Sequence, residues 1–272
     1  MSLPEGHYAP VGEGLRVHYH DLGQGERAVL FLHGSGPGAS GWSNFAANAE
    51  LLAAAGFRCI LADNLGYGLS SKPDRDYGMD FIADGNLALM HSLGLERYAI
   101  VGNSHGGAQA IRIALRHPER VSKLLLMAPG GLEEREVYMQ MRGIRSMLRC
   151  LYGPEGLTLE GMQKVFERQL FDPACVPADV VQQRYEIALT QPLRVFRTLD
   201  VPNQEEQLAE LRCPVLGLWG AKDLFCPVSG AMKLATQVPD CRVTVFNRCG
   251  HWVMVEKKAL FDRLALDFLQ HG

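Results

Sequence analysis

The sequence predicts an α/β fold, with helices on both faces of a mostly parallel sheet and a helical segment inserted late in the chain. Three observations predict it. Short apolar runs with few charges recur along the chain, helix-like stretches separate most of them, and one long region contains no such run. Strands with few charges are typical of a sheet buried on both faces. Strands alternating with helices indicate parallel pairing.

Seven runs are expected to be strands: LRVHYHDLG, RAVLFLHG, FRCILADN, RYAIVGN, KLLLMAPG, PVLGLWG and CRVTVFN. The link GQGE between the first two predicts a hairpin. Helices are expected at 42–55, 77–93, 106–117, 229–238 and 256–270. Residues 132–207 are rich in Met, Arg, Glu and Leu and read as several short helices. We therefore expect a core made of residues 1–131 and 208–272, with residues 132–207 as a helical cap.

Composition limits the classes of function. The 272 residues carry a net charge of −3, so nucleic acid and anionic membranes are not expected partners. No run approaches the roughly 18 apolar residues of a membrane span, and the N-terminus lacks the pattern of a signal peptide. Seven cysteines without a CxxC pair favour reduced thiols in a cytoplasmic protein. A homo-oligomer, dimer or tetramer, is also expected.

The stretch GNSHG places Ser104 between an apolar strand and a helix. A nucleophile in such a turn takes strained backbone angles and needs small neighbours, which Gly102 and Gly106 provide. A serine that only caps the helix would fit the same motif. A serine needs a base, and the base needs an orienting acid.

The base and the acid are expected at strand ends that follow Ser104 in the chain. His251 comes just after the last strand and before the last helix. His117 ends a helix, and His271 lies beside the chain end, so both are weaker candidates. Asp223 follows the strand before His251 and is the favoured acid. The rival acids are Asp63, Asp200 and Asp240.

The loop HGSGPG follows the second strand and has almost no side-chain bulk. We expect the N–H groups of Ser35 and His105 to form an oxyanion hole. The loop does not open a helix directly, which disfavours a nucleotide site. His18 and His20 share a strand face but lack a third ligand, so no metal is expected. No cofactor is expected either.

These motifs together resemble the α/β-hydrolase fold and, within it, the meta-cleavage product hydrolases. Those enzymes cleave carbon–carbon bonds in 2-hydroxy-6-oxo-dienoates formed by aromatic ring fission. The specific pieces are HGSGPGASGWSNF, GNSHGG, ALRHPERVSKLLLMAPGG, QRYEIA and VFNRCGHWVMVEKKALFDRLALDFL. An apolar residue usually follows the nucleophile in this family, where this chain has a histidine. The turn KDLFCP also departs from the commonest, more charged pattern.

The resemblance implies that Ser104, Asp223 and His251 form a catalytic triad. It also implies that Asn44 and Asn103 hold the polar head of the substrate. Arg184 would pair with the dienoate carboxylate, Trp252 would pack over the same end, and Phe225 would line the apolar end. The small-molecule substrate implied is a dienoate. A general carboxylesterase or lactonase, and a non-catalytic binding protein of the same fold, remain alternatives.

Overall fold

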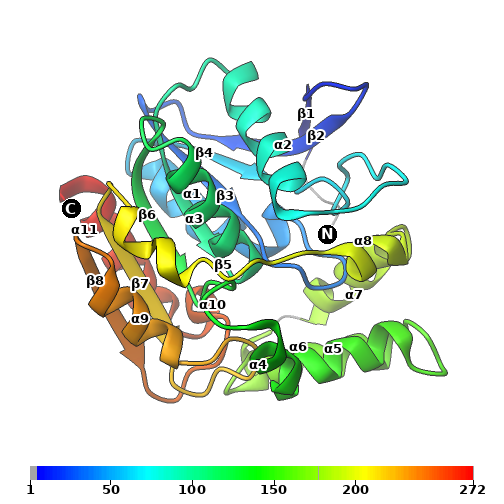
Figure 1. Ribbon diagram of the computed structural model, residues 1–272. Helices are drawn as coiled ribbons and strands as arrows, with labels where there is room; N and C mark the ends of the chain where they lie inside the picture. Colours follow the sequence, from blue (N-terminus) through cyan, green and yellow to red (C-terminus); the bar gives the residue numbers. More distant parts are fainter. Residues whose placement is uncertain (1–4, 177, 272) are drawn as a thin grey trace.

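Eight strands form one sheet in the computed structural model of the chain, which describes residues 5–176 and 178–271 (Figure 1). Their order across the sheet is β1-β2-β4-β3-β5-β6-β7-β8. The strands are β1 His7–Pro10, β2 Arg16–Leu22, β3 Arg27–Leu32, β4 Phe57–Ala62, β5 Tyr98–Asn103, β6 Val121–Met127, β7 Val215–Gly220 and β8 Cys241–Phe246. From β4 to β8 all neighbours pair in parallel. The predicted α/β class, with a mostly parallel sheet, is confirmed.

The predicted hairpin between the first two expected strands is wrong. Strand β4 lies between β2 and β3, antiparallel to the first and parallel to the second. Gly23 has a positive φ of 81° and turns the chain away from β2. A Cβ on Gly25 would lie 1.9 Å from the carbonyl oxygen of Gly56, so the link passes tightly over the turn before β4. The chain therefore crosses the end of β4 before it re-enters the sheet.

The hairpin partner of β2 is instead β1, a four-residue strand that no sequence pattern predicted. Tyr8 pairs with His18 and Pro10 with Arg16. Only Ala9 of β1 is buried, so the segment has no apolar run to mark it as a strand. Strand pairing at the sheet edge, rather than its own sequence pattern, makes this segment extended.

Helices cover both faces of the sheet because successive strand residues point to opposite sides. In β3, Leu30 joins the apolar core under one set of helices, and Phe31 joins the core under the other. The first set is α2 Met79–Ser92, α3 His105–Arg116 and α9 Ser229–Gln237. The second set is α1 Gly41–Ala54, α10 Val253–Glu256 and α11 Lys258–His271. The last predicted helix is thus two helices, separated at Lys257.

A helical insertion, residues 135–198, lies beyond the carboxyl ends of the strands (Figure 1). It follows β6, and the short η2 Glu205–Glu210 then leads to β7. Its elements are α4 Arg135–Gln140, α5 Arg142–Tyr152, α6 Leu159–Gln169, η1 Pro173–Cys175, α7 Ala178–Ala188 and α8 Leu193–Thr198. Apolar residues of α6 such as Phe166 pack into the same core as α1 and α11. The division into core and cap at 131/132 and 207/208 stays a prediction.

All seven cysteines are free thiols, and five of them are buried. None of the helices in the described ranges is long and apolar enough to cross a membrane.

Candidate active site

Ser104 occupies a strained turn between β5 and α3. Its φ is 57° and its ψ is −119°, outside the regions that a serine normally adopts. A Cβ on Gly102 would lie 2.6 Å from the carbonyl oxygen of Gly106, and a Cβ on Gly106 would lie 2.0 Å from that of Leu32. The two glycines therefore let the strand end, the helix start and β3 meet. The turn places Ser104 at the N-terminus of α3, where peptide dipoles favour negative charge.

His251 and Asp223 come together from the ends of neighbouring strands. The Nδ1 atom of His251 lies 2.7 Å from Oδ2 of Asp223. The other carboxylate oxygen accepts the backbone N–H groups of Phe225 at 2.7 Å and Cys226 at 3.0 Å. An ionised carboxylate only accepts, so the His251 proton lies on Nδ1 and Nε2 is free to take a proton. The Phe225 ring stacks on the imidazole at 5.1 Å between ring centres.

A cavity of about 30 Å³ joins these groups. At that volume the cavity holds about one water molecule. Its lining is Gly34, Ser35, Gly36, Asn44, Asn103, Ser104, Ile144, Met147, Gln169, Arg184, Phe225, His251 and Trp252. Most of the residues implied by the family resemblance thus share one cavity.

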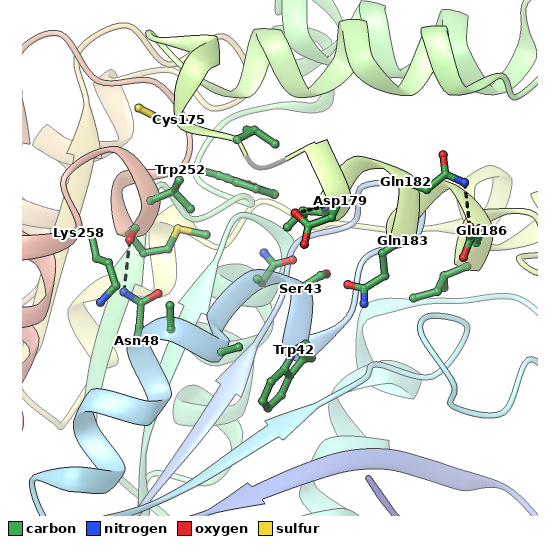
Figure 2. Close-up of a pocket in the computed structure, with 18 of the residues that line it drawn as sticks. Trp42, Ser43, Asn48, Cys175, Asp179, Gln182, Gln183, Glu186, Trp252 and Lys258 are labelled. Carbon is green, nitrogen blue, oxygen red and sulfur yellow. Dashed lines mark hydrogen bonds between the residues drawn. The ribbon is translucent and has the colours of Figure 1, made fainter. Parts of the chain in front are cut away.

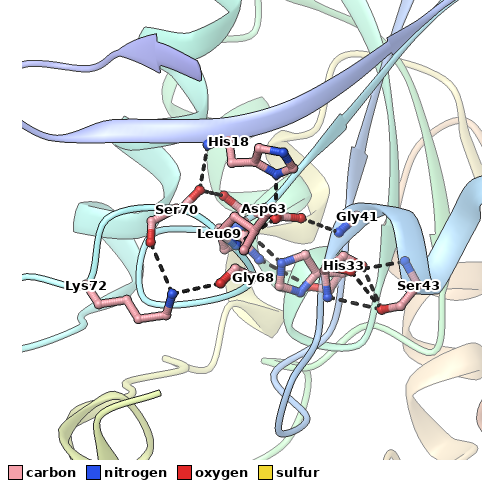
Figure 3. A network of polar contacts seen from close by, with 11 residues as sticks. His18, His33, Gly41, Ser43, Asp63, Gly68, Leu69, Ser70 and Lys72 are labelled. Atoms are coloured by element: carbon pink, nitrogen blue, oxygen red, sulfur yellow. Dashed lines mark hydrogen bonds and ion pairs between the residues drawn. The ribbon is translucent and has the colours of Figure 1, made fainter. Parts of the chain in front are cut away.

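The rival acids are placed elsewhere. Figure 3 shows Asp63 between β2 and the start of α1, where it binds His18 at 2.8 Å and the backbone N–H of Gly41 at 2.8 Å. Burial alone would raise the pKa of Asp63, but the hydrogen bond from His18 lowers it below its usual value. Asp200 and Asp240 are exposed. The geometry therefore pairs Asp223, rather than these three, with His251.

Two further histidines have structural contacts. His117 is the residue that ends α3, as predicted, and His18 binds Asp63. Within the described residues, no group of three His, Cys, Asp or Glu side chains could hold a metal ion.

The two expected oxyanion donors flank Ser104. A Cβ on Gly34 would lie 3.2 Å from the Cβ of Ser104, so the glycine loop that contains Ser35 packs directly on the serine. His105 is the first residue of α3. Its ring is buried away from the cavity, with Nδ1 bound to the Gln109 amide at 3.0 Å. Burial lowers the pKa of His105 to about 3, so this ring is neutral at neutral pH.

Arg184 brings an unpaired positive charge into the cavity. The residue comes from α7 of the helical insertion and is 2% exposed. Its guanidinium lies over the rings of Phe166 and Trp252, with 5.1 and 5.4 Å to their centres. It donates to Oδ1 of Asn44 at 3.2 Å and to the carbonyl of Pro37 at 3.4 Å.

Within residues 5–176 and 178–271, no carboxylate forms an ion pair with Arg184. Burial lowers the pKa of the guanidinium to about 9. A buried charge without a counter-ion is costly. The buried guanidinium therefore carries this cost in the free protein.

Three lining residues of the insertion were missed in the sequence: Ile144, Met147 and Gln169. They lie on ordinary amphipathic helices, so only the packing of α5 and α6 over the sheet reveals them. The carbonyl of Gln169 accepts the backbone N–H groups of His251 at 2.6 Å and Trp252 at 3.3 Å. The insertion thus contacts the loop of the candidate base directly. Asn103, by contrast, was expected, and its amide donates to the Met127 carbonyl at 3.2 Å.

A larger groove, of about 990 Å³, opens on the outer side of this cavity. Figure 2 shows it between α1 and α7, with Trp42 and Glu186 among its walls. It shares only Asn44 and Trp252 with the catalytic cavity. Ser104 and His251 line the smaller cavity and are not among the lining residues of the groove.

The fold and this site define a serine hydrolase of the α/β type, and comparison with known proteins agrees. A family model described as the alpha/beta hydrolase fold matches residues 27–258. A 2-hydroxy-6-oxononadienedioate/2-hydroxy-6-oxononatrienedioate hydrolase from Pseudomonas putida is 38% identical over 97% of this chain and 96% of its own length. A 2-hydroxy-6-oxo-6-phenylhexa-2,4-dienoate hydrolase from Burkholderia cepacia is 38% identical over 94% and 92%.

Solved structures give the same answer. A meta-cleavage product hydrolase from Pseudomonas fluorescens IP01 is 29% identical over 94% of this chain and 95% of that chain, with a TM-score of 0.83. A phenylhexadienoate hydrolase from Rhodococcus sp. strain RHA1 is 26% identical over 98% of both chains, with a TM-score of 0.85. The chain belongs to the α/β-hydrolase fold family and, within it, to the meta-cleavage product hydrolases, as its motifs predicted.

Replacing Ser104 by alanine should lower kcat at least about a thousandfold and leave the fold intact. The expected reason is loss of the nucleophile from a turn that the glycines still permit. Steady-state kinetics and circular dichroism on the same preparation check it. More than a tenth of the activity, in a sample free of wild-type enzyme, would contradict the assignment.

The Asp223→Asn variant should also lose most of its activity, by about 10⁴-fold in kcat, because an amide favours the wrong tautomer of His251. Asp200→Asn and Asp240→Asn are matched controls, since both residues are exposed. Turnover of the three variants is compared side by side. Damage by either control, with Asp223→Asn active, would move the acid elsewhere.

Stability should fall as the pH drops, because two histidines are buried in their neutral form. Burial lowers the pKa of His33 to about 4 and that of His105 to about 3, from 6.5. Between pH 6.5 and about 4 the unfolded chain therefore binds protons that the folded chain does not. Each such group costs about 1.4 kcal/mol of unfolding free energy per pH unit.

Urea unfolding of the wild type and the His105→Met variant at several pH values measures this dependence. As the pH falls, the free energy of unfolding of the variant should decrease less steeply than that of the wild type, by about 1.4 kcal/mol per pH unit, because one fewer proton is bound on unfolding. Identical slopes would mean that His105 titrates normally.

Proposed function

We propose that this protein hydrolyses the carbon–carbon bond of a 2-hydroxy-6-oxo-hexa-2,4-dienoate-type ring-fission product in aromatic degradation. The products are 2-hydroxypenta-2,4-dienoate, or a substituted form, and a carboxylic acid. The observation that carries the proposal is the buried, unpaired Arg184 in the same cavity as Ser104 and His251. A dienoate supplies the carboxylate that this guanidinium lacks, whereas a simple neutral ester does not.

In the proposed complex, the substrate carboxylate binds the planar guanidinium, which suits it bidentately. Asn44 already orients that guanidinium, and Trp252 covers its face. Asn103 lines the same cavity and would contact the polar head of the substrate. The distal end of the substrate then lies toward Phe225, Ile144 and Met147. Because these three side chains are apolar, we expect alkyl or aryl substituents to be preferred there over a second carboxylate.

The reaction begins with conversion of the dienol to its keto form. A proton is added to the carbon next to the distal ketone, and His251 carries it. Ser104 then attacks the distal ketone while Nε2 of His251 accepts the hydroxyl proton. The oxyanion rests on the N–H groups of Ser35 and His105, at the positive end of α3.

The carbon–carbon bond then breaks, and its electron pair passes into the keto-enoate, which becomes the dienol product after proton transfer from His251. Water, deprotonated by the same imidazole, hydrolyses the acyl group from Ser104. One water molecule is consumed, and two acids leave. An alternative in which Ser104 instead assists a water molecule predicts no acyl-enzyme, which rapid-quench mass spectrometry detects.

A general carboxylesterase or lactonase would use the same triad and oxyanion hole but would not need Arg184. A non-catalytic binding protein would not react with a serine-directed phosphonate at Ser104. The role of residues 132–207 as a cap, a cytoplasmic location and a dimer or tetramer stay predictions beside this function.

Arg184→Gln distinguishes the dienoate hydrolase from an esterase. Removing the guanidinium should cost about 2–5 kcal/mol in kcat/KM for a dienoate, because its carboxylate then lies unpaired in a dry pocket. Hydrolysis of a nitrophenyl acetate should change much less, since the triad is untouched. The matched control is Arg194→Gln, which removes an exposed arginine of the same insertion.

The ratio of the loss in kcat/KM for the dienoate to the loss for nitrophenyl acetate, measured on one preparation, decides between the dienoate hydrolase and the esterase. Equal losses on both substrates would mean that Arg184 only supports the fold. No loss on the dienoate would place the carboxylate elsewhere and favour the esterase.

A further inference from the structure

A continuous row of hydrogen-bonded buried polar residues runs from His105, one expected oxyanion donor, to His33, two residues before Ser35, the other expected donor. From His105 Nδ1 it passes to Gln109 at 3.0 Å, and from Gln109 Oε1 to the Asn86 amide at 2.9 Å. The Asn86 amide also donates to Asn64 Oδ1 at 2.8 Å, and the Asn64 backbone N–H donates to His33 Nε2 at 3.0 Å. All five residues are at most 2% exposed. We call them the buried amide row.

The hydrogen bonds fix the tautomers of both histidines. Because the backbone N–H of Asn64 points at Nε2 of His33, the His33 proton lies on Nδ1. That Nδ1–H then donates to the carbonyl of Gly34 at 2.8 Å. The Gln109 amide donates to Nδ1 of His105, whose proton therefore lies on Nε2. Both pKa values are lowered by burial, so each ring keeps one neutral form at neutral pH.

The hydrogen bond from His33 Nδ1 to the Gly34 carbonyl determines the direction of the Ser35 N–H, one of the two expected oxyanion donors. In a trans peptide the C=O and the following N–H point in opposite directions. Holding the Gly34 carbonyl against His33 therefore turns the Ser35 N–H away from His33. The Asn64 side chain also donates to the His33 carbonyl at 3.3 Å. That bond fixes the preceding peptide, between His33 and Gly34. The loop that contains Ser35 has little side-chain bulk of its own to fix this orientation.

At the other end, Gln109 holds His105 from one turn further along α3, and Asn86 holds Gln109 from α2. We propose that the buried amide row aligns the backbone N–H groups of Ser35 and His105, with Gln109, Asn86 and Asn64 as positioning residues. The proposal rests on the oxyanion hole of the proposed function.

Stability alone does not explain this arrangement. Apolar side chains of similar size would fill the same space without the cost of burying amides and imidazoles. Among the residues that the structure describes, Asn86 Oδ1 and His105 Nε2 of the row are also buried without a hydrogen-bond partner. Connected polar networks restrict side chains to one arrangement. An oxyanion hole requires that property, because its donors must be placed before charge develops.

The test separates stability from alignment with a double-mutant cycle of His105→Met and Gln109→Leu. Each single variant leaves a buried polar group unpaired and should lower Tm. The double variant removes both groups, so it should be more stable than the sum of the single effects. If the row aligns the oxyanion hole, kcat of the double variant stays at least about tenfold below that of the wild type. KM for the dienoate should change little, because Arg184 is untouched.

Phenylboronic acid provides a second readout, since its adduct with Ser104 places an oxygen in the oxyanion hole. Its inhibition constant should rise by a factor similar to the loss in kcat. The control is Lys123→Met, which removes hydrogen bonds to the Phe268 and Leu269 carbonyls far from the site. That variant should lower Tm without changing kcat or boronate affinity.

Recovery of kcat to within twofold of the wild type in the double variant would overturn the proposal and leave a purely structural row. The same measurements with a nitrophenyl ester keep this test independent of the substrate. The ester also needs the oxyanion hole, so its kcat should fall equally. A wild-type protein that turns over the ester but no dienoate would contradict the proposed function, while the ester data would still decide the role of the row.

Discussion

The active site depends on one steric constraint, the turn at Ser104. The end of β5, the start of α3 and the end of β3 meet there so closely that neither Gly102 nor Gly106 could carry a Cβ. The strained serine is therefore the meeting point of three elements. The parallel sheet then brings the remaining groups to the same edge. Asp223 follows β7 and His251 follows β8, so the candidate base lines the same cavity as Ser104 with its acid already bound.

In the proposed function, chemistry and substrate recognition come from different parts of the chain. The sheet edge supplies Ser104, His251, Asp223 and the oxyanion loop. The helical insertion supplies Arg184 and the apolar side chains of α5. The guanidinium lies against the Phe166 and Trp252 rings and lacks a counter-ion among the described residues, so in the proposed complex a substrate carboxylate would offset the electrostatic cost of burying it.

The sequence could predict the parts of the site that short-range patterns determine. Ser104, Asp223 and His251 each follow an apolar strand, and parallel strands bring such positions together. The hairpin at GQGE failed because strand order is decided by long-range pairing, which a four-residue link does not reveal. Strand β1 was missed because one buried residue gives no periodicity. Gln169, Ile144 and Met147 could not be found, since helices without a known packing direction do not show which face reaches the cavity.

The buried amide row illustrates the same limit. His105 stood out in the sequence only as a departure from the usual apolar neighbour of the nucleophile. Its meaning depends on Gln109, Asn86 and Asn64, which come from two helices and a strand end far apart in the chain. Polar residues in helices read as surface positions until their burial is known. The structure makes them one network beneath the site.

Product identification tests the central claim most directly. The protein is incubated with the yellow ring-fission product that carries a 6-phenyl group, in water enriched in ¹⁸O, and the products are separated by mass. Carbon–carbon hydrolysis in this cavity predicts loss of colour with equal amounts of 2-hydroxypenta-2,4-dienoate and benzoate, and ¹⁸O from the solvent in the benzoate. An unchanged dienoate, beside rapid hydrolysis of simple esters by the same sample, would contradict it.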